Sequence, residues 1–417
     1  MSSPPHSPIA IIGAGPVGLT LASILQNNHI PFTLYEASSS IRSQGGSLDL
    51  HPSSGQLALR EAGLWDAFTR LSRPESDVQK IVALDGEVLW DGNTTDRQDK
   101  KDDERFDGRP EIDRRELVNL LFGNLDAGVV VFGKKVGRIV PSSSVSAEKE
   151  GGEGEGEGEP THTLLFTDGT TAGPYSLIIG CDGAWSPTRS FLSPTTKPTY
   201  SGISMACASI ATTNPNSWLS DYVGAGTMFS FGKDTGVIAQ RGDAGFVSVY
   251  AALRCPENML KECGIDWTDG DTARQQFTDR FFGHVHPDLQ RVFLEAKDEV
   301  TPRALYELPV GFEWVHKEGV TLAGDAAHLM TPFAGVGVNV GMEDAVVLGR
   351  EVMQAWRGEK GLDDAVRKYE AEMVPRAKNF AERTKRSKEK RFLEGGAQGF
   401  AEMLREAYGS APGPTGR

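Results

Sequence analysis

The chain has 417 residues, of which 39% are hydrophobic and 24% are charged, so it carries enough apolar material for a large core. Its length suits two interlocked domains, or one α/β domain with an inserted lobe. The formal net charge of −14 argues against nucleic acid or an anionic membrane surface as a partner. The four cysteines (Cys181, Cys207, Cys255 and Cys263) form no CxxC pair, which argues against a disulfide framework or a zinc site and favours a cytoplasmic compartment.

The first predicted elements form a βαβ unit. Strands are expected over residues 9–12 and 32–35, with a helix over 18–27 between them. The turn before the helix has the pattern GxGxxG: Gly13 permits the tight turn, Gly15 admits a pyrophosphate close to the backbone, and Gly18 lets the helix pack on the strand. Glu36 ends the second strand, where its carboxylate can accept hydrogen bonds from a ribose. The unit predicts a dinucleotide site but leaves NAD and FAD open.

The middle of the chain predicts further helices, core strands and a second lobe. Helices are expected over residues 54–69, 114–125, 337–356 and 368–391, and core strands over 164–166, 177–180 and 320–322. Glycine-broken runs between residues 203 and 253 predict an antiparallel sheet. Residues 93–107 are expected to form a polar loop. The low-complexity stretch 142–160 cannot bury surface and is expected to be disordered.

A second glycine-rich segment decides between the two cofactors. Gly324-Asp325-Ala326-Ala327-His328 follows a strand, and the residues from Pro332 to Asn339 lead into a helix. An NAD dehydrogenase needs no second segment of this kind, whereas an extended FAD does. Asp325 can bond hydroxyls of the ribityl chain, and the helix start can point its N–H groups at the flavin edge that becomes negative on reduction. We interpret His328 as a packing or hydrogen-bonding residue rather than a proton-transfer group.

Together with Cys181-Asp182-Gly183, which runs into Ser186 and Arg189, these segments resemble class A FAD-dependent monooxygenases of the aromatic-hydroxylase type. Within that family the chain is most similar to the flavin-dependent tetracycline-inactivating monooxygenases, on residues 45–51, 54–56, 109–114 and 324–339. The resemblance implies an α/β fold, in which a Rossmann-like FAD-binding domain is interleaved with a substrate lobe built on an antiparallel sheet and followed by a C-terminal helix.

The expected domain boundaries follow this resemblance. The FAD-binding domain is expected in three parts, and the substrate lobe in two. In chain order they are residues 1–75 (FAD), 76–108 (substrate-lobe hairpin and loop), 109–190 (FAD), 191–304 (substrate), 305–356 (FAD) and 357–417 (C-terminal helix and tail).

The resemblance also implies roles for single residues. Arg114 would contact FAD, Gly45 and Gly46 would line the flavin's path, and Asp182 would lie near both the flavin and an incoming NADPH or NADH. Arg114 can neutralise pyrophosphate charge, and glycines admit a flat ring close to the backbone. Two alternatives stay open: Arg114 as a surface helix residue, and Asp182 as a turn-former. The remaining cofactor-binding candidates are Asp325, Pro332, Gly335, Gly337, Val338 and Asn339.

The substrate lobe departs from the family pattern. Tetracycline-inactivating enzymes offer glutamine, arginine and histidine side chains to the substrate, and the matching stretches 205–208, 224–228 and 245–253 lack them. A more apolar pocket is therefore expected. Its candidate lining residues are Met205, Cys207, Met228, Phe229, Phe231, Tyr250, Pro332 and Phe333, although strand alternation turns some strand residues away. If the substrate is a phenol, His51, Tyr250 or water could activate it.

The implied reaction is insertion of one oxygen atom into a lipophilic, ring-containing small molecule. NADPH or NADH would reduce FAD, and O₂ would add to give a flavin C4a-hydroperoxide as the oxygen donor. Hydroxylation, epoxidation and Baeyer–Villiger insertion stay open. Two alternatives remain: a flavin oxidase or dehydrogenase without oxygen insertion, and a non-catalytic FAD-containing ligand binder. No catalytic side chain, metal or membrane span is expected, and the chain is expected to be a monomer or weak dimer.

Overall fold

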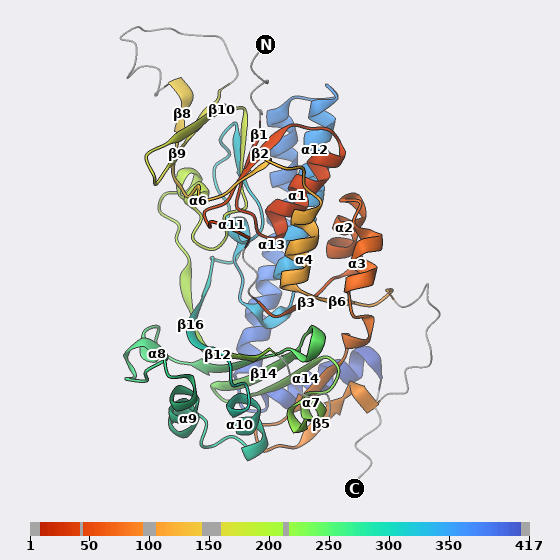
Figure 1. Ribbon diagram of the computed structural model, residues 1–417, viewed down its shortest axis with the longest axis vertical. Coiled ribbons are helices and arrows are strands. Elements are labelled where there is room, and N and C mark those ends of the chain that lie inside the picture. Colours follow the sequence, from red (N-terminus) through yellow and green to blue (C-terminus); the bar gives the residue numbers. More distant parts are fainter. Residues whose placement is uncertain (1–8, 42–44, 95–105, 144–159, 212–216, 410–417) are drawn as a thin grey trace.

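The computed structural model describes residues 9–41, 45–94, 106–143, 160–211 and 217–409. Residues 1–8, most of the expected loop 93–107 and nearly all of the low-complexity stretch 142–160 lie outside these residues. The described residues form two lobes, and the long helix α13 (Leu362–Arg391) runs from one to the other (Figure 1).

The nucleotide lobe is built on a five-stranded parallel sheet. All four residues of β1 are buried, as expected for a parallel strand covered on both faces. The strand order is β17 (Val320–Leu322), β11 (Leu177–Gly180), β1 (Ile9–Ile12), β2 (Phe32–Tyr35) and β7 (Val130–Val131). The bounds of β1, β2, β11 and β17 are those predicted from the sequence.

Helices around this sheet are α1 (Pro16–Asn27), α4 (Arg114–Gly123), α6 (Pro187–Leu192), α11 (Asp325–His328) and α12 (Gly337–Trp356). The single helix predicted over 54–69 is wrong. The segment folds as η1 (Pro52–Gln56), α2 (Leu57–Glu61) and α3 (Trp65–Leu71). The break follows from Gly63, which adopts φ +69°, a left-handed conformation that a continuing helix does not allow.

Two small sheets flank the nucleotide lobe. One is antiparallel, with the order β10 (Thr171–Tyr175), β9 (His162–Phe166) and β8 (Val136–Pro141). The other is a ribbon of β3 (Ser47–Asp49) and β6 (Glu111–Asp113), which lies between the two lobes in Figure 1.

The second lobe, here called the sheet lobe, is a seven-stranded sheet. Its order is β16 (Val300–Glu307), β12 (Thr199–Ile210), β15 (Val247–Arg254), β14 (Thr235–Arg241), β13 (Thr227–Gly232), β4 (Gln79–Val82) and β5 (Val88–Asp91). Strands β12 to β15 pair antiparallel, as expected between residues 203 and 253, while β4 joins the sheet parallel to β13. β4 and β13 are neighbours in space but distant in sequence, so no hairpin constrains their direction.

Different elements cover the two faces of this sheet. One face packs against α7 (Trp218–Val223), α9 (Gly270–Phe281) and α10 (Pro287–Leu294), with α8 (Met259–Glu262) nearby. The opposite face is covered in part by α14 (Gly396–Tyr408) and by the end of α13. The single helix and tail expected over 357–417 are therefore wrong: α13 is followed by a second helix, which buries Phe400 and Leu404 on the sheet.

Candidate active site

The first glycine turn leaves an open space in front of its backbone. Gly13 has φ +101°, and a Cβ there would lie 2.5 Å from the carbonyl oxygen of Cys181. A Cβ on Gly18 would lie 2.1 Å from the carbonyl oxygen of Gly13. Both positions therefore require glycine for packing. A Cβ on Gly15 would meet no protein atom within 4 Å, so this glycine faces free space at the N-terminus of α1.

Glu36 holds this turn at the end of β2. Its Oε2 accepts a hydrogen bond from the backbone N–H of Ala14 at 2.9 Å, and its Oε1 accepts one from that of Ser38 at 2.8 Å. The carboxylate thus lies beside the turn, within the space where a ribose would follow a pyrophosphate.

The second glycine segment meets the first through Val17. A Cβ on Gly324 would lie 2.9 Å from the Val17 side chain, and one on Gly341 would lie 2.6 Å from it. Glycine at both positions lets α1 and α12 pack closely, which brings the two segments together across some three hundred residues of sequence. Asp325 is exposed here, whereas Ala326 and His328 are buried. A Cβ on Gly337, the first residue of α12, would again meet nothing within 4 Å.

A buried cluster of charged residues, formed by Asp344, His328 and Arg376, stabilises the turn at Gly324. Asp344 is fully buried and accepts hydrogen bonds from Gly324 N–H at 2.9 Å, His328 Nε2 at 2.6 Å and Arg376 at 2.8 Å. Burial lowers the pKa of His328, but the charge and hydrogen bond of Asp344 have the larger effect, so the pKa of His328 is raised. Burial raises the pKa of Asp344, but His328, Arg376 and the Gly324 N–H together lower it. The hydrogen-bonding interpretation of His328 is confirmed.

The segment Gly45–Ser47 lies between the nucleotide lobe and the sheet lobe. A Cβ on Gly45 would lie 2.6 Å from Cδ of Arg114, and the Arg114 N–H donates to the Gly46 carbonyl at 3.1 Å. On its other side, a Cβ on Gly46 would lie 2.4 Å from Oε1 of Gln240 and 2.7 Å from the Tyr250 hydroxyl. Gly46 therefore contacts the sheet directly.

Asn339 joins the start of α12 to the next part of the same segment. Its Oδ1 accepts the His51 N–H at 2.8 Å, and its Nδ2 donates to the Asp49 carbonyl at 2.8 Å. The His51 ring lies 3.2 Å from the Asp49 carboxylate. The Asn339 side chain therefore holds the backbone of this segment by hydrogen bonds, a role that was not predicted from the sequence.

Asp182 accepts hydrogen bonds from the first turn of α6 through one of its two carboxylate oxygens. Its Oδ2 accepts hydrogen bonds from the N–H and hydroxyl of Thr188, at 3.1 and 2.7 Å, which supports the structural alternative for this residue. Its Oδ1 is buried without a hydrogen-bond partner among the described residues, as is Nε of Arg189. Burial raises the pKa of Asp182 despite these bonds.

One row of side chains across the sheet lobe is only partly covered, and the space in front of it is here called the hollow. Cys207, Tyr250, Ile238 and Phe229 are paired in register on β12, β15, β14 and β13, and all four are half-buried. The neighbouring row on the opposite face provides the contrast: Ala208, Val249, Ala239 and Met228 are at most 5% exposed. The first row therefore faces space that the described residues do not fill, next to Gly46.

Met228 belongs to this second row and packs against the helices of the far face. Its place among the substrate-lining candidates is wrong, because side chains alternate along β13 and Phe229 takes the other face. Met205, Phe231 and Phe333 lie on the same face as Phe229 but are nearly fully buried, as core beside the hollow rather than its surface. Pro332 is exposed.

Comparison with known proteins decides the family. The model of the FAD binding domain matches residues 155–384. Monooxygenase asqM of Emericella nidulans is 30% identical over 82% of this chain and 83% of that protein. The chain belongs to the FAD-dependent monooxygenases.

Solved structures share the fold of this monooxygenase. Klebsiella pneumoniae HpxO complexed with FAD and uric acid has a TM-score of 0.73 at 23% identity and covers 95% of this chain and 92% of its own. The tetracycline destructase Tet(55) has a TM-score of 0.67 at 18% identity, over 99% of both chains. The class A recognition is confirmed, and at these identities the likeness to each structure concerns the fold.

The nucleotide lobe fits FAD on its own geometry. The spaces in front of Gly15 and Gly337 would receive the pyrophosphate and the flavin edge, and both lie at helix N-termini. The Arg114 side chain lies against Gly45 and forms no ion pair among the described residues, which leaves its charge for a ligand. A cluster of three or more metal-ligating side chains does not occur in the described part of the chain. None of the described helices is long and apolar enough to cross a membrane.

Two kinds of residue at the site were missed from the sequence. Gln240 is a strand residue whose amide pairs with both backbone groups of Ser47, at 3.0 Å each. Arg303 and Arg391 lie on the same side of the sheet as the hollow. Alternation along β14 places Gln240 on the face of Ile238, but nothing in the sequence shows that Ser47, 193 residues away, lies opposite. These residues add polar groups beside the more apolar pocket that was expected.

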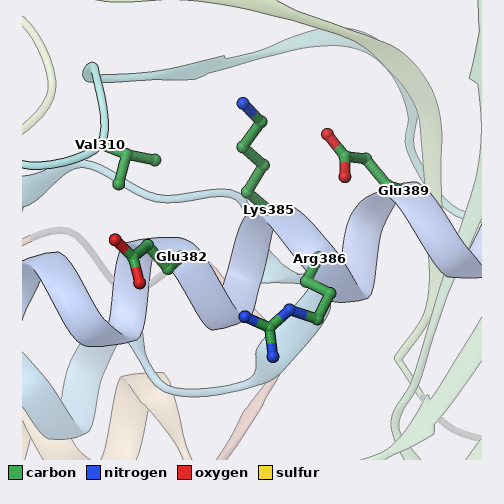
Figure 2. Close-up of a pocket in the computed structure, with 5 residues that line it drawn as sticks. All are labelled: Val310, Glu382, Lys385, Arg386 and Glu389. Atoms are coloured by element: carbon green, nitrogen blue, oxygen red, sulfur yellow. The ribbon is translucent and has the colours of Figure 1, made fainter.

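An open pocket of about 350 Å³ on the side of α13 is distinct from this site (Figure 2). It is lined by Val310 and by two acidic and two basic residues of α13, namely Glu382, Lys385, Arg386 and Glu389. Its mixed charge and exposed setting do not suit a lipophilic ring.

A buried acid behind Ser47 makes stability depend on pH. Glu111 is 6% exposed and its Oε2 has no hydrogen-bond partner among the described residues. Burial raises its pKa to about 8, only partly offset by a hydrogen bond from Ser47 and the charge of Arg73. The folded protein therefore keeps this proton well above pH 4.5, where an unfolded glutamate releases it.

Since the unfolded state binds fewer protons, Glu111 makes the folded state lose stability as pH rises from about 4.5 through 8. We expect E111Q, which stays neutral, to gain stability relative to the parent by on the order of 3 kcal/mol between pH 5 and pH 8. Thermal melting of both proteins across this range measures it. A melting difference that does not grow with pH would show that Glu111 is ionised in the fold.

Proposed function

We propose that this monooxygenase binds a lipophilic, ring-containing small molecule in the hollow over Cys207, Tyr250, Ile238 and Phe229, and inserts one oxygen atom into it. The proposal depends on one observation: these four side chains are partly exposed, whereas the neighbouring row on the other face of the sheet is covered. The exposed row lies where Gly46 contacts the sheet. FAD, when bound, supplies the oxygen-transfer chemistry, with NADPH or NADH as the reductant.

The nucleotide lobe would hold FAD through both glycine segments. We assign the pyrophosphate to Gly15 and Arg114, the adenosine ribose to Glu36, and ribityl hydroxyls to Asp325. The first N–H groups of α12, from Gly337 and Val338, are free of helix partners and carry the positive end of the helix dipole. They would stabilise negative charge on the ring system. Asn339 would serve by fixing the segment Asp49–His51 against that helix.

The sheet lobe would orient the substrate and exclude water. Phe229 and Ile238 offer apolar surface to a ring. The Tyr250 hydroxyl lies against Gly46, where it can hold a substrate oxygen near the reacting edge. Burial raises the pKa of Tyr250, so this hydroxyl stays protonated at neutral pH and acts as a hydrogen-bond donor. The sheet lobe thus places the substrate, while the nucleotide lobe places the cofactor.

The test uses the FAD-loaded enzyme with NADPH or NADH and a panel of phenols, naphthols and other ring compounds. A substrate should stimulate consumption of the reductant and yield a product heavier by one oxygen atom, with little hydrogen peroxide released. If every compound that binds stimulates consumption of the reductant but all of the oxygen consumed appears as hydrogen peroxide, the oxidase alternative is favoured. A variant I238W, which fills the hollow, should lose turnover while it keeps FAD.

A further inference from the structure

Arg391, the last residue of α13, lies among aromatic rings with its charge unpaired. Its guanidinium carbon is 4.2 Å from the ring centre of Phe400, 5.2 Å from that of Phe231 and 5.6 Å from that of Phe229. No hydrogen bond or ion pair involves this side chain among the described residues. Burial lowers its pKa to about 10, and no carboxylate opposes this effect.

A guanidinium in such a place is costly unless something compensates its lost hydration. Aromatic faces return about 0.5–2 kcal/mol per contact, less than a carboxylate in a bidentate pair would provide. Other cations of this chain have close polar partners: Arg376 pairs with Asp344 at 2.8 Å, Lys388 pairs with Glu307 at 2.6 Å, and the buried Arg189 donates hydrogen bonds to the carbonyls of Ala326 and Ala184. Arg391 differs from them, although the protein as a whole carries a net charge of −14.

The hollow over the sheet row is bordered by positive charge. The positive charges of Arg303 and Arg114 both lower the pKa of Tyr250, against the larger effect of burial. The charge of Arg303 lowers the pKa of the Cys207 thiol in the same way. Arg303 is exposed and therefore screened by water, whereas Arg391 lies against Phe229, which is part of the row itself.

We propose that the substrate is an organic anion and that Arg391 is the residue that recognises its negative charge. The inference rests on the proposed function, because it assigns a ligand to the same hollow. Phe229 and Tyr250 are separated by the single strand β14, so these two residues lie roughly 10 Å apart, with Arg391 on the Phe229 side and Gly46 on the Tyr250 side. A carboxylate, or an equally acidic enolate, at one end of a one- or two-ring skeleton would reach Arg391 while its other end lies beside Gly46.

The experiment compares binding of acids and their neutral amides to the FAD-loaded enzyme. The probes are salicylate against salicylamide, and 6-hydroxy-2-naphthoate against 6-hydroxy-2-naphthamide. Dissociation constants come from the change in the visible flavin spectrum at pH 7.5, without reductant. We expect the parent to bind at least one acid about tenfold or more tightly than its amide, and R391M to lose that preference while it binds the amide equally well.

The matched control is R254M. Arg254 also lies over a ring of this aromatic cluster, 5.9 Å from the centre of Phe392, but it has Asp234 as an acidic neighbour at 3.4 Å. R254M should keep the preference, and all variants should keep FAD. If R391M loses FAD or unfolds, R391Q replaces it.

The proposal is overturned if the parent shows no preference for either acid, if R391M or R391Q keeps the preference, or if R303M rather than R391M loses it. These readouts measure binding alone. A protein that prefers acids through Arg391 but transfers no oxygen would refute the proposed function and leave this inference standing.

Discussion

Replacing Gly15 with valine is expected to leave the protein folded but almost free of FAD. A Cβ at this position meets no protein atom within 4 Å, so the fold tolerates the side chain. The same space is where the backbone must approach the pyrophosphate, and branched methyl groups would occupy it. We expect FAD bound per protein, measured after gel filtration by absorbance and by release on denaturation, to fall more than tenfold, and NAD(P)H oxidation to fall with it.

The control for G15V is G123V. Gly123 ends α4, and a Cβ there also meets nothing within 4 Å, but it lies outside both glycine segments. This variant should keep its flavin. A G15V protein that retains FAD as the parent does would contradict the placement of the pyrophosphate at this turn. D325A should weaken FAD retention less, because one set of hydroxyl contacts is lost rather than the whole space.

Replacing Asp344 with alanine is expected to destabilise the protein by about 3–5 kcal/mol, the range for removing one member of a buried charged group. The carboxylate is fully buried, and its loss would leave Arg376 without its closest acid and the Gly324 N–H without its acceptor. Urea unfolding measures the loss. FAD retention should fall as well, because Gly324 precedes Asp325 at the second glycine segment.

Its neighbour Glu343 serves as the control. Glu343 lies 3.5 Å from the same Arg376 but is only half-buried, so E343A should cost about 1 kcal/mol or less. D344N tests geometry against charge, since the amide oxygen can still accept from Gly324. Equal stabilities of D344A and E343A would show that the cluster is not what holds this turn.

The nucleotide lobe was largely predictable from the sequence because its information is local. A run such as Ile9–Ile12 that must be buried on both faces, followed by glycines at fixed spacing, admits few other structures. The bounds of α12 were predicted for the same reason, since Gly337 and Trp356 enclose one continuous apolar pattern. The assignment of FAD followed from the second glycine segment, and the family comparison confirms it.

The sheet lobe was less predictable because its contacts join distant residues. Alternation shows that Met228 and Phe229 face opposite ways, but not which of them faces the cofactor. Helix α14 was missed although Ala397, Phe400, Ala401 and Leu404 recur at helical spacing, and the sequence does not show that its apolar face packs on strands more than a hundred residues away. The proposed role of Arg391 could not be predicted for the same reason. It requires that α13 ends over β13 and that the Phe229 ring points toward Arg391, and both are contacts between distant residues.

The most direct test of the account is the origin of the oxygen atom in the product. The FAD-loaded enzyme, NAD(P)H and a ring substrate that stimulates its oxidation are incubated once under ¹⁸O₂ in ordinary water and once under ordinary O₂ in H₂¹⁸O, and the product is weighed by mass spectrometry. We predict one ¹⁸O atom per product molecule in the first experiment and none in the second. A product that carries no oxygen from ¹⁸O₂, or that takes its oxygen from water, would contradict the assignment of this protein as a monooxygenase.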